Sequence, residues 1–258
     1  MIKRLIFDVD GTLITGVNFV DAIKKTLKRL NIYSDEKTVA FLEGIKTYEN
    51  KFNNYNIDDY TAHMSNAINN HLPKEFLRVF FEELKDVIPS KNETLFKTIK
   101  DLSNKYELVL LTNYFSESQL NRLNNMGIGH FFIECYGEKL IKPNFDAYIS
   151  ACGKHTPSEC VIIGDDIFLD IEQAQKVGLN TIFVNKKNIK NYNVKTLEVQ
   201  RVEEINVNLI NVIEEKRKWN IMEQNLTKTN INWYITCYDK TFKNTCFIRN
   251  LINCFLHF

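Results

Sequence analysis

Residues 5–13 read LIFDVDGTL, and the rest of the chain is organised around this stretch. Three apolar residues run into two carboxylates, a glycine and a hydroxyl, which is typical of a buried parallel strand that ends in a turn. Asp8 and Asp10 alternate with Val9, so we expect both carboxylates near the edge of the sheet where ligands collect. Two acids this close are costly to bury unless a cation lies between them, and carboxylate oxygens suit Mg²⁺. By itself, the stretch fits either a metal site or an acidic turn in solvent.

Composition and charge restrict the classes of partner. The chain has 258 residues, 44% of them hydrophobic and 25% charged, as in an ordinary globular protein. Lys and Arg number 33 against 32 Asp and Glu, a balance that attracts neither nucleic acid nor an anionic membrane. The sequence has no apolar run of about 20 residues that would span a membrane. We therefore expect no nucleic-acid partner and no membrane span.

The compartment is predicted from the N-terminus and the cysteines. The apolar run after Lys3 and Arg4 is cut off by Asp8, which is too early for a signal peptide. The six cysteines show no CxxC spacing. Without an export signal, reduced thiols are the expected state, so we predict a cytoplasmic protein.

The region from residue 18 to residue 88 has helical periodicity. The first of four predicted helices carries Val20, Ile23 and Leu27 on one face, and Ser34 is placed to cap the second. A third follows Ile57, and Pro73 stands where the fourth would begin. Four amphipathic helices without a convincing strand predict a small bundle. Inserted between the first and second strands, this bundle would form a cap over the carboxyl ends of the strands.

After residue 88, helices and strands alternate. Helices are expected over residues 93–103, 116–127, 142–152 and 169–177, and strands over 106–111, 131–136, 160–163 and 181–184, the last of the sheet. Ser116 and Gln119 match a capping box, and Gly127 and Gly178 are placed to end helices. Such alternation indicates βαβ units and a parallel sheet covered on both faces.

The predicted fold class is therefore α/β, with a doubly wound, Rossmann-like parallel sheet as the core and an inserted α-helical bundle as the cap. We assign residues 1–15 and 89–218 to the core, 16–88 to the cap and 219–258 to a C-terminal tail. The tail carries an apolar helical face over residues 247–256 and is expected to play no part in catalysis.

Polar groups at four predicted strand or helix ends resemble the four motifs of the haloacid dehalogenase superfamily, most of whose members are phosphatases. The motifs read Asp8-Val9-Asp10-Gly11-Thr12, Leu111-Thr112-Asn113, Lys142-Pro143, and Gly164-Asp165-Asp166 with Asp170. The resemblance covers residues 1–215, and the helical insertion resembles the first cap class of the superfamily. Each motif alone is weakly specific, but all four in order are strongly so.

The resemblance implies a role for each residue. Asp8 is the expected nucleophile that forms an aspartyl-phosphate, and Asp10 the general acid and base. Thr112 and Asn113 are expected to bind the substrate. Lys142 would offset the negative charge of Asp8 and of the phosphoryl group.

The resemblance also implies a Mg²⁺ site. Its ligands would be Asp8, the backbone carbonyl of Asp10 and an acid after Gly164. Because this sequence fits two spacings, either Asp165 or Asp166 is the direct ligand. Asp170 is expected to orient Lys142 or a metal-bound water.

Asp10 also distinguishes branches of the superfamily. Its dehalogenases lack an acid there, because a halide leaves without a proton, so Asp10 favours hydrolysis of a phosphomonoester. We therefore expect a Mg²⁺-dependent phosphatase acting on a small phosphorylated metabolite. The alternatives are a sugar phosphomutase on the same fold, and a non-catalytic module that binds a phosphometabolite or a partner protein. The sequence specifies neither the substrate nor the oligomeric state.

Overall fold

The computed structural model describes residues 1–52, 54–190 and 192–215. By its contacts, the chain divides into two compact units, Met1–Ile210 and Asn211–Phe258. The predicted tail, residues 219–258, lies outside the described residues. Among the described residues, none of the helices combines the length and the apolar character needed to cross a bilayer.

The first unit contains a sheet of six parallel strands in the order β3-β2-β1-β4-β5-β6. Phe7 at the end of β1 pairs with Leu110 on one side and Ile163 on the other, so three strands end at one level. The strand order reverses between β1 and β4, which is the point where open α/β sheets bind ligands. The strands are β1 (Arg4–Phe7), β2 (Glu107–Leu111), β3 (Glu134–Tyr136), β4 (Cys160–Gly164), β5 (Asn180–Val184) and β6 (Leu197–Val199).

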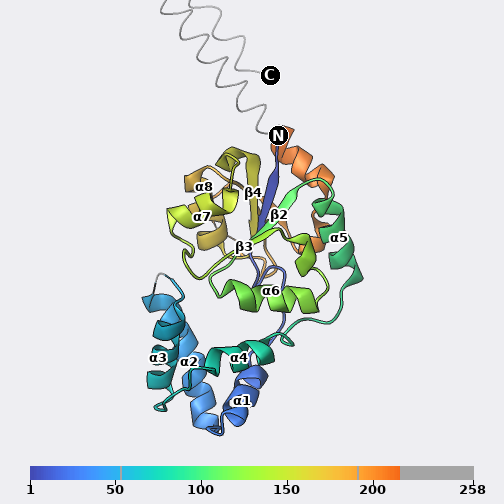
Figure 1. Cartoon of the computed structure of the whole chain (residues 1–258). Coiled ribbons are helices and arrows are strands. Elements are labelled where there is room, and N and C mark those ends of the chain that lie inside the picture. The colour runs from blue at the N-terminus through green and yellow to red at the C-terminus, as the bar shows by residue number, and fades with distance from the viewer. Residues whose placement is uncertain (53, 191, 216–258) are drawn as a thin grey trace, which may run out of the picture. The chain divides into compact units, whose positions relative to one another are not determined.

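Helices cover both faces of this sheet. Figure 1 shows α7 (Phe145–Cys152) and α8 (Gln173–Val177) on one side and α5 (Glu93–Ser103) on the other. Ile6 and Ile162 pack against the α7–α8 face, while Leu5 and Val161, their neighbours in sequence, are also fully buried. Burial on both faces explains why the strands are continuous apolar runs. The predicted fold class is confirmed.

The cap consists of α1 (Val20–Arg29), α2 (Asp35–Lys51), α3 (Ile57–Ala67) and α4 (Phe76–Leu84). Its helices lie beyond the carboxyl ends of the strands (Figure 1). The Ser34 hydroxyl accepts a hydrogen bond from the Lys37 amide, as expected of a residue that caps α2. Pro73 lies three residues before α4, so this helix starts later than predicted.

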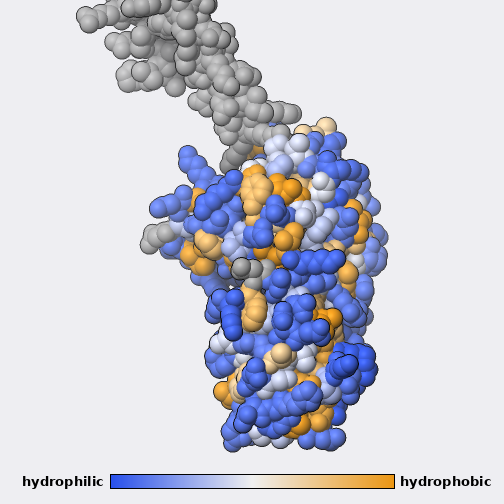
Figure 2. All heavy atoms as spheres, turned by 60° about the vertical axis from the view of Figure 1, so that its left-hand side comes forward, coloured by the Kyte–Doolittle hydropathy of each residue, from blue (hydrophilic) through white to orange (hydrophobic). Residues whose placement is uncertain are grey.

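Aromatic packing holds the cap together and against the core. The Phe41 ring lies 5.1 Å from the Phe80 ring, centroid to centroid, inside the cap. Phe115, which follows β2, lies 5.3 Å from the rings of Tyr55 and Phe81. These contacts place the helical bundle over the strand ends. On the face shown in Figure 2, apolar residues are interspersed with hydrophilic ones.

Further local predictions were wrong. Thr181–Val184 is not the last strand, because β6 follows it in the chain and pairs with β5. Ser116 is the first residue of α6 (Ser116–Asn125) rather than its cap, and its hydroxyl donates to Glu138. The helix predicted from residue 169 begins as a π-helical segment, η3 (Ile167–Glu172), and continues into α8. Three short 3₁₀ turns, η1 (Gly129–Phe131), η2 (Pro157–Glu159) and η4 (Val202–Glu204), and a helix over 207–215 complete the described elements.

Candidate active site

The strand ends bring four of the predicted residues together in buried positions. Asp8 extends β1 by one residue, its amide donating to the Ile163 carbonyl at 2.9 Å, and Thr112 extends β2 in the same way. Asp8, Thr112, Lys142 and Asp170 are each at most 7% exposed. Buried polar groups require partners, so the hydrogen bonds among them define the site.

Lys142 forms ion pairs with two carboxylates. Its Nζ donates to Oδ1 of Asp8 at 2.8 Å and to Oδ1 of Asp170 at 2.6 Å. Burial acts to lower the pKa of the ammonium, but the charges of Asp170 and Asp8 outweigh burial and raise it. Asn113 holds the backbone of Lys142, accepting from its amide and donating to its carbonyl, both at 2.8 Å. In this structure Asn113 therefore orients Lys142.

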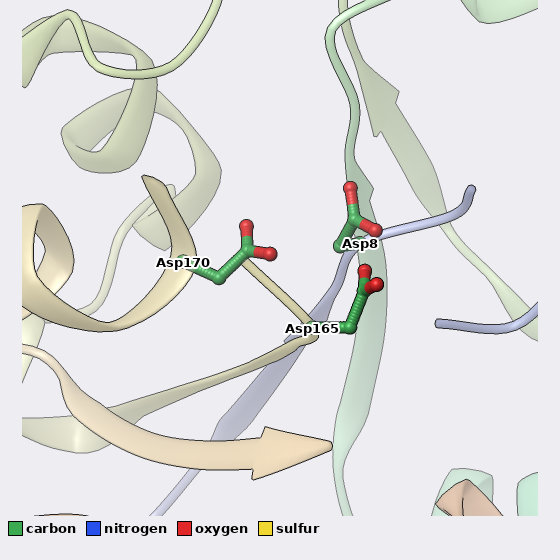
Figure 3. Close-up of side chains that lie close together, drawn as sticks. All are labelled: Asp8, Asp165 and Asp170. Carbon is green, nitrogen blue, oxygen red and sulfur yellow. The ribbon is translucent and has the colours of Figure 1, made fainter. Parts of the chain in front are cut away.

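Asp8, Asp165 and Asp170 form a carboxylate cluster. Each offers an oxygen within 4.8 Å of the others, and Figure 3 shows the three side chains close together, with Asp165 pointing toward Asp8. Burial raises the pKa of all three acids, that of Asp8 to about 7 against the lowering effect of Lys142. Asp165 accepts a hydrogen bond from the Thr12 hydroxyl at 3.2 Å, but forms no ion pair with any described residue.

This cluster fits a hard divalent cation. Lys142 pairs with only two of the three acids, so negative charge is in excess, and oxygen ligands of this kind suit Mg²⁺. Gly11 provides the space for Asp165: a Cβ at residue 11 would lie 2.4 Å from both carboxylate oxygens. Its φ of +90° is also in the region that favours glycine.

Asp166 lies outside the cluster. It is exposed, and its Oδ1 accepts hydrogen bonds from the amides of Phe168 and Leu169 at 2.9 and 2.8 Å. It thus caps the N-terminus of η3. Of the two acids that the sequence left open as metal ligands, only Asp165 faces Asp8.

Asp10 lies beside the cluster and is held by two residues that we did not predict as part of the site. Arg122 Nη1 donates to Asp10 Oδ1 at 2.7 Å, and Gln119 Nε2 donates to Asp10 Oδ2 at 2.6 Å. Both come from α6, three residues apart on its buried face. The sequence does carry a signal for them, because Gln119 and Arg122 share the helical face that Leu123 marks as buried.

A cavity of about 940 Å³ opens onto these groups and is lined by both core and cap. The cap contributes mostly apolar and aromatic side chains, among them Phe52 and Tyr55, and one carboxylate, Glu49. The Tyr55 hydroxyl donates to Glu49 at 3.2 Å, and burial raises the pKa of that carboxyl. The cavity is therefore lined by the carboxylate cluster on the core side and by largely apolar side chains with one carboxylate on the cap side.

Comparison with known proteins identifies the class. Residues 2–178 match the family model described as haloacid dehalogenase-like hydrolase, so the chain belongs to this family of hydrolases. A curated relative from Bacillus subtilis (strain 168), named "Putative HAD-hydrolase YfnB", is 26% identical over 231 residues, covering 79% of this chain and 93% of the relative.

Solved structures agree on the fold. A structure of YfnB from Bacillus subtilis, described as bound to magnesium, has a TM-score of 0.56 at 20% identity, covering 79% of this chain and 96% of that one. A HAD phosphatase from Thermococcus onnurineus has a TM-score of 0.55 at 21% identity, and the match covers 79% of this chain and 95% of that one. A 2-haloacid dehalogenase from Pseudomonas syringae pv. Tomato DC3000 has a TM-score of 0.56 at 16% identity, and the match covers 84% of this chain and 99% of that one. Both reaction types therefore occur on this fold, and the choice between them depends on the site.

Proposed function

We propose that this protein is a Mg²⁺-dependent phosphatase that hydrolyses a small phosphomonoester through an aspartyl-phosphate on Asp8. The observation that carries the proposal is the carboxylate of Asp10, two residues from Asp8 and held at the cavity by Arg122 and Gln119. An alkoxide needs a proton to leave whereas a halide does not, so an acid in this position favours phosphate esters over haloacids.

The first half of the reaction transfers the phosphoryl group to the enzyme. An oxygen of the Asp8 carboxylate attacks phosphorus, and the bond between phosphorus and the leaving oxygen breaks. The Asp10 carboxyl gives its proton to that oxygen, so the alcohol leaves neutral and Asp10 becomes a carboxylate.

The second half releases phosphate. Asp10, now a carboxylate, takes a proton from a water molecule whose oxygen attacks phosphorus. The bond between phosphorus and Asp8 breaks, which returns Asp8 as a carboxylate and Asp10 as an acid. The net reaction is hydrolysis of the ester to an alcohol and inorganic phosphate.

The other residues bind and orient. Lys142 neutralises negative charge next to Asp8, and Asp170 with Asn113 fixes the lysine in place. The Thr112 hydroxyl, which accepts from Gln119 at 3.0 Å, is free to donate its own hydrogen to a phosphoryl oxygen.

We propose that Mg²⁺ is held by Asp8, Asp165 and the backbone carbonyl of Asp10. Asp165 is preferred to Asp166 because only Asp165 belongs to the carboxylate cluster. When bound, Mg²⁺ would neutralise charge on the phosphoryl oxygens and keep Asp8 ionised.

The test is hydrolysis of p-nitrophenyl phosphate and of 2-chloropropionate by the same preparation, with Mg²⁺ and with chelator. We expect Mg²⁺-dependent release of phosphate and no release of chloride. Chloride release without phosphate release would make the protein a dehalogenase. Transfer between positions of a sugar phosphate without net phosphate release would make it a mutase, and the absence of all three activities would favour a binding module.

A further inference from the structure

We infer that Arg122 and Gln119 are positioning residues that fix the Asp10 carboxylate for proton transfer. We also infer that Arg122 connects this carboxylate to the two linkers of the cap, the segments through which the chain enters and leaves it. The inference rests on the proposed function, because it concerns the general acid of that reaction. Neither residue belongs to the four motifs, and neither touches Asp8 in the hydrogen bonds of the site.

The two donors hold Asp10 by both oxygens. Arg122 Nη1 binds Oδ1 and Gln119 Nε2 binds Oδ2, and the two side chains are joined by a further hydrogen bond of 2.8 Å from Nη1 to Gln119 Oε1. Both donors are fully buried, whereas the Asp10 side chain is 42% exposed. A half-exposed carboxylate otherwise rotates about χ2, and two buried donors restrict this rotation. Each donor occupies one of about four lone-pair positions, which leaves the others for the transferred proton.

The rest of the Arg122 guanidinium is held by the cap linkers. Its Nε and Nη2 donate to the Val87 carbonyl at 3.2 and 3.1 Å, and its central carbon lies 5.2 Å from the centre of the Phe19 ring. Phe19 directly precedes α1, and Val87 follows α4 by three residues. One planar side chain therefore contacts the chain where it enters the cap, the chain where it leaves, and the general acid. A lysine presents a single ammonium and cannot make this set of contacts.

A general acid in the wrong place has a recognisable kinetic effect. The parameter kcat/KM reports the steps up to phosphoryl transfer, in which Asp10 protonates the leaving oxygen. An alkyl phosphate needs this proton, whereas p-nitrophenolate leaves as a stable anion. Loss of positioning therefore lowers kcat/KM for the alkyl ester far more than for the aryl ester, while a general loss of structure lowers both equally.

The experiment measures kcat/KM for an alkyl phosphate and for p-nitrophenyl phosphate in Arg122→Lys and Gln119→Met, per folded molecule. We expect losses of roughly 10²-fold for the alkyl ester in Arg122→Lys, less in Gln119→Met, and about threefold or less for the aryl ester in both. Asp10→Asn should show the same selectivity. Ser118→Ala is the matched control, because Ser118 is a buried residue of the same helix whose hydroxyl makes no hydrogen bond to Asp10. This variant should leave both values unchanged.

A double variant completes the test. If Arg122 acts through Asp10, then Arg122→Lys should lower the alkyl kcat/KM no further in an Asp10→Asn background. Equal losses on both esters, or additive losses in the double variant, would overturn the inference and leave Arg122 a structural residue. If Arg122→Lys does not fold, Gln119→Met decides by the same criterion. If Asp10→Asn itself lacks the selectivity, the proposed role of Asp10 fails instead, so the two failures are distinguishable.

Discussion

Replacing Gly11 by Ala tests whether the position of the Asp165 carboxylate controls activity. A Cβ at residue 11 would lie 2.4 Å from both Asp165 oxygens, against 3.4 Å or more in ordinary contacts, so Asp165 must retreat by about 1 Å. A displacement of this size costs about 10²-fold in rate, or about 2.7 kcal/mol of activation free energy. The φ of +90° adds backbone strain of about 1–2 kcal/mol to the folded state.

Gly16→Ala is the matched control, since Gly16 also has a positive φ, +68°, but a Cβ at residue 16 would meet nothing within 4 Å. Both variants should lose similar stability in thermal unfolding with chelator present. Only Gly11→Ala should lose turnover and need more Mg²⁺ for half-maximal activity, measured in a Mg²⁺ titration. If the two variants agree within about threefold in both quantities, Asp165 does not control the site and the reasoning is wrong.

Other contacts in the structure lead to three more predictions. Asp165→Asn should raise the Mg²⁺ requirement at least about tenfold, whereas Asp166→Asn should change it little, because Asp166 caps η3; equal effects in the Mg²⁺ titration would contradict this assignment. Glu49→Gln removes a negative charge from the cavity wall, so it should favour substrates with a carboxylate in the leaving group, such as phosphoglycolate. The ratio of kcat/KM for such a substrate to kcat/KM for a neutral ester should rise by up to about tenfold. An unchanged ratio would exclude Glu49 from substrate selection. Hydrogen bonding from Arg4 lowers the pKa of Glu107 from 4.5 to about 2, so Glu107 stabilises the fold above pH about 4.5 and loses this effect as the pH falls toward 2. The difference in thermal unfolding midpoint between wild type and Glu107→Gln should therefore shrink as the pH falls over that interval. A constant difference would refute the linkage between this pKa and stability.

The sequence predicted the elements whose signal is long or strongly patterned. The continuous apolar strands β1, β2 and β4 and the four cap helices were predicted because each carries several buried residues at a regular spacing. The strand β6 has three residues, of which only Val199 is fully buried, so no period exists to detect. The weaker strand β3 was predicted too long, because residues 129–131 form a 3₁₀ turn before it.

The site was harder to predict where local and tertiary interactions compete. Gln119 fits a capping box by its spacing from Ser116, yet its amide is used by Asp10, which is 109 residues away in sequence. Adjacent acids after a strand look equivalent in sequence, but Asp165 turns toward Asp8 while Asp166 bonds the amides of its own turn. Which partner each of these side chains binds depends on the three-dimensional geometry of the strand end, and residue spacing in the sequence does not specify that geometry.

The central claim, that Asp8 carries the phosphoryl group during turnover, is tested most directly by mass spectrometry of acid-quenched enzyme. The protein is mixed with substrate and Mg²⁺, quenched within the first turnovers, and digested to peptides. We predict one phosphoryl group on the peptide that contains Asp8, lost on treatment with hydroxylamine as an acyl phosphate is, and absent from Asp8→Asn. Steady hydrolysis with no phosphorylated enzyme at any quench time, or a phosphoryl group on another residue, would contradict the account.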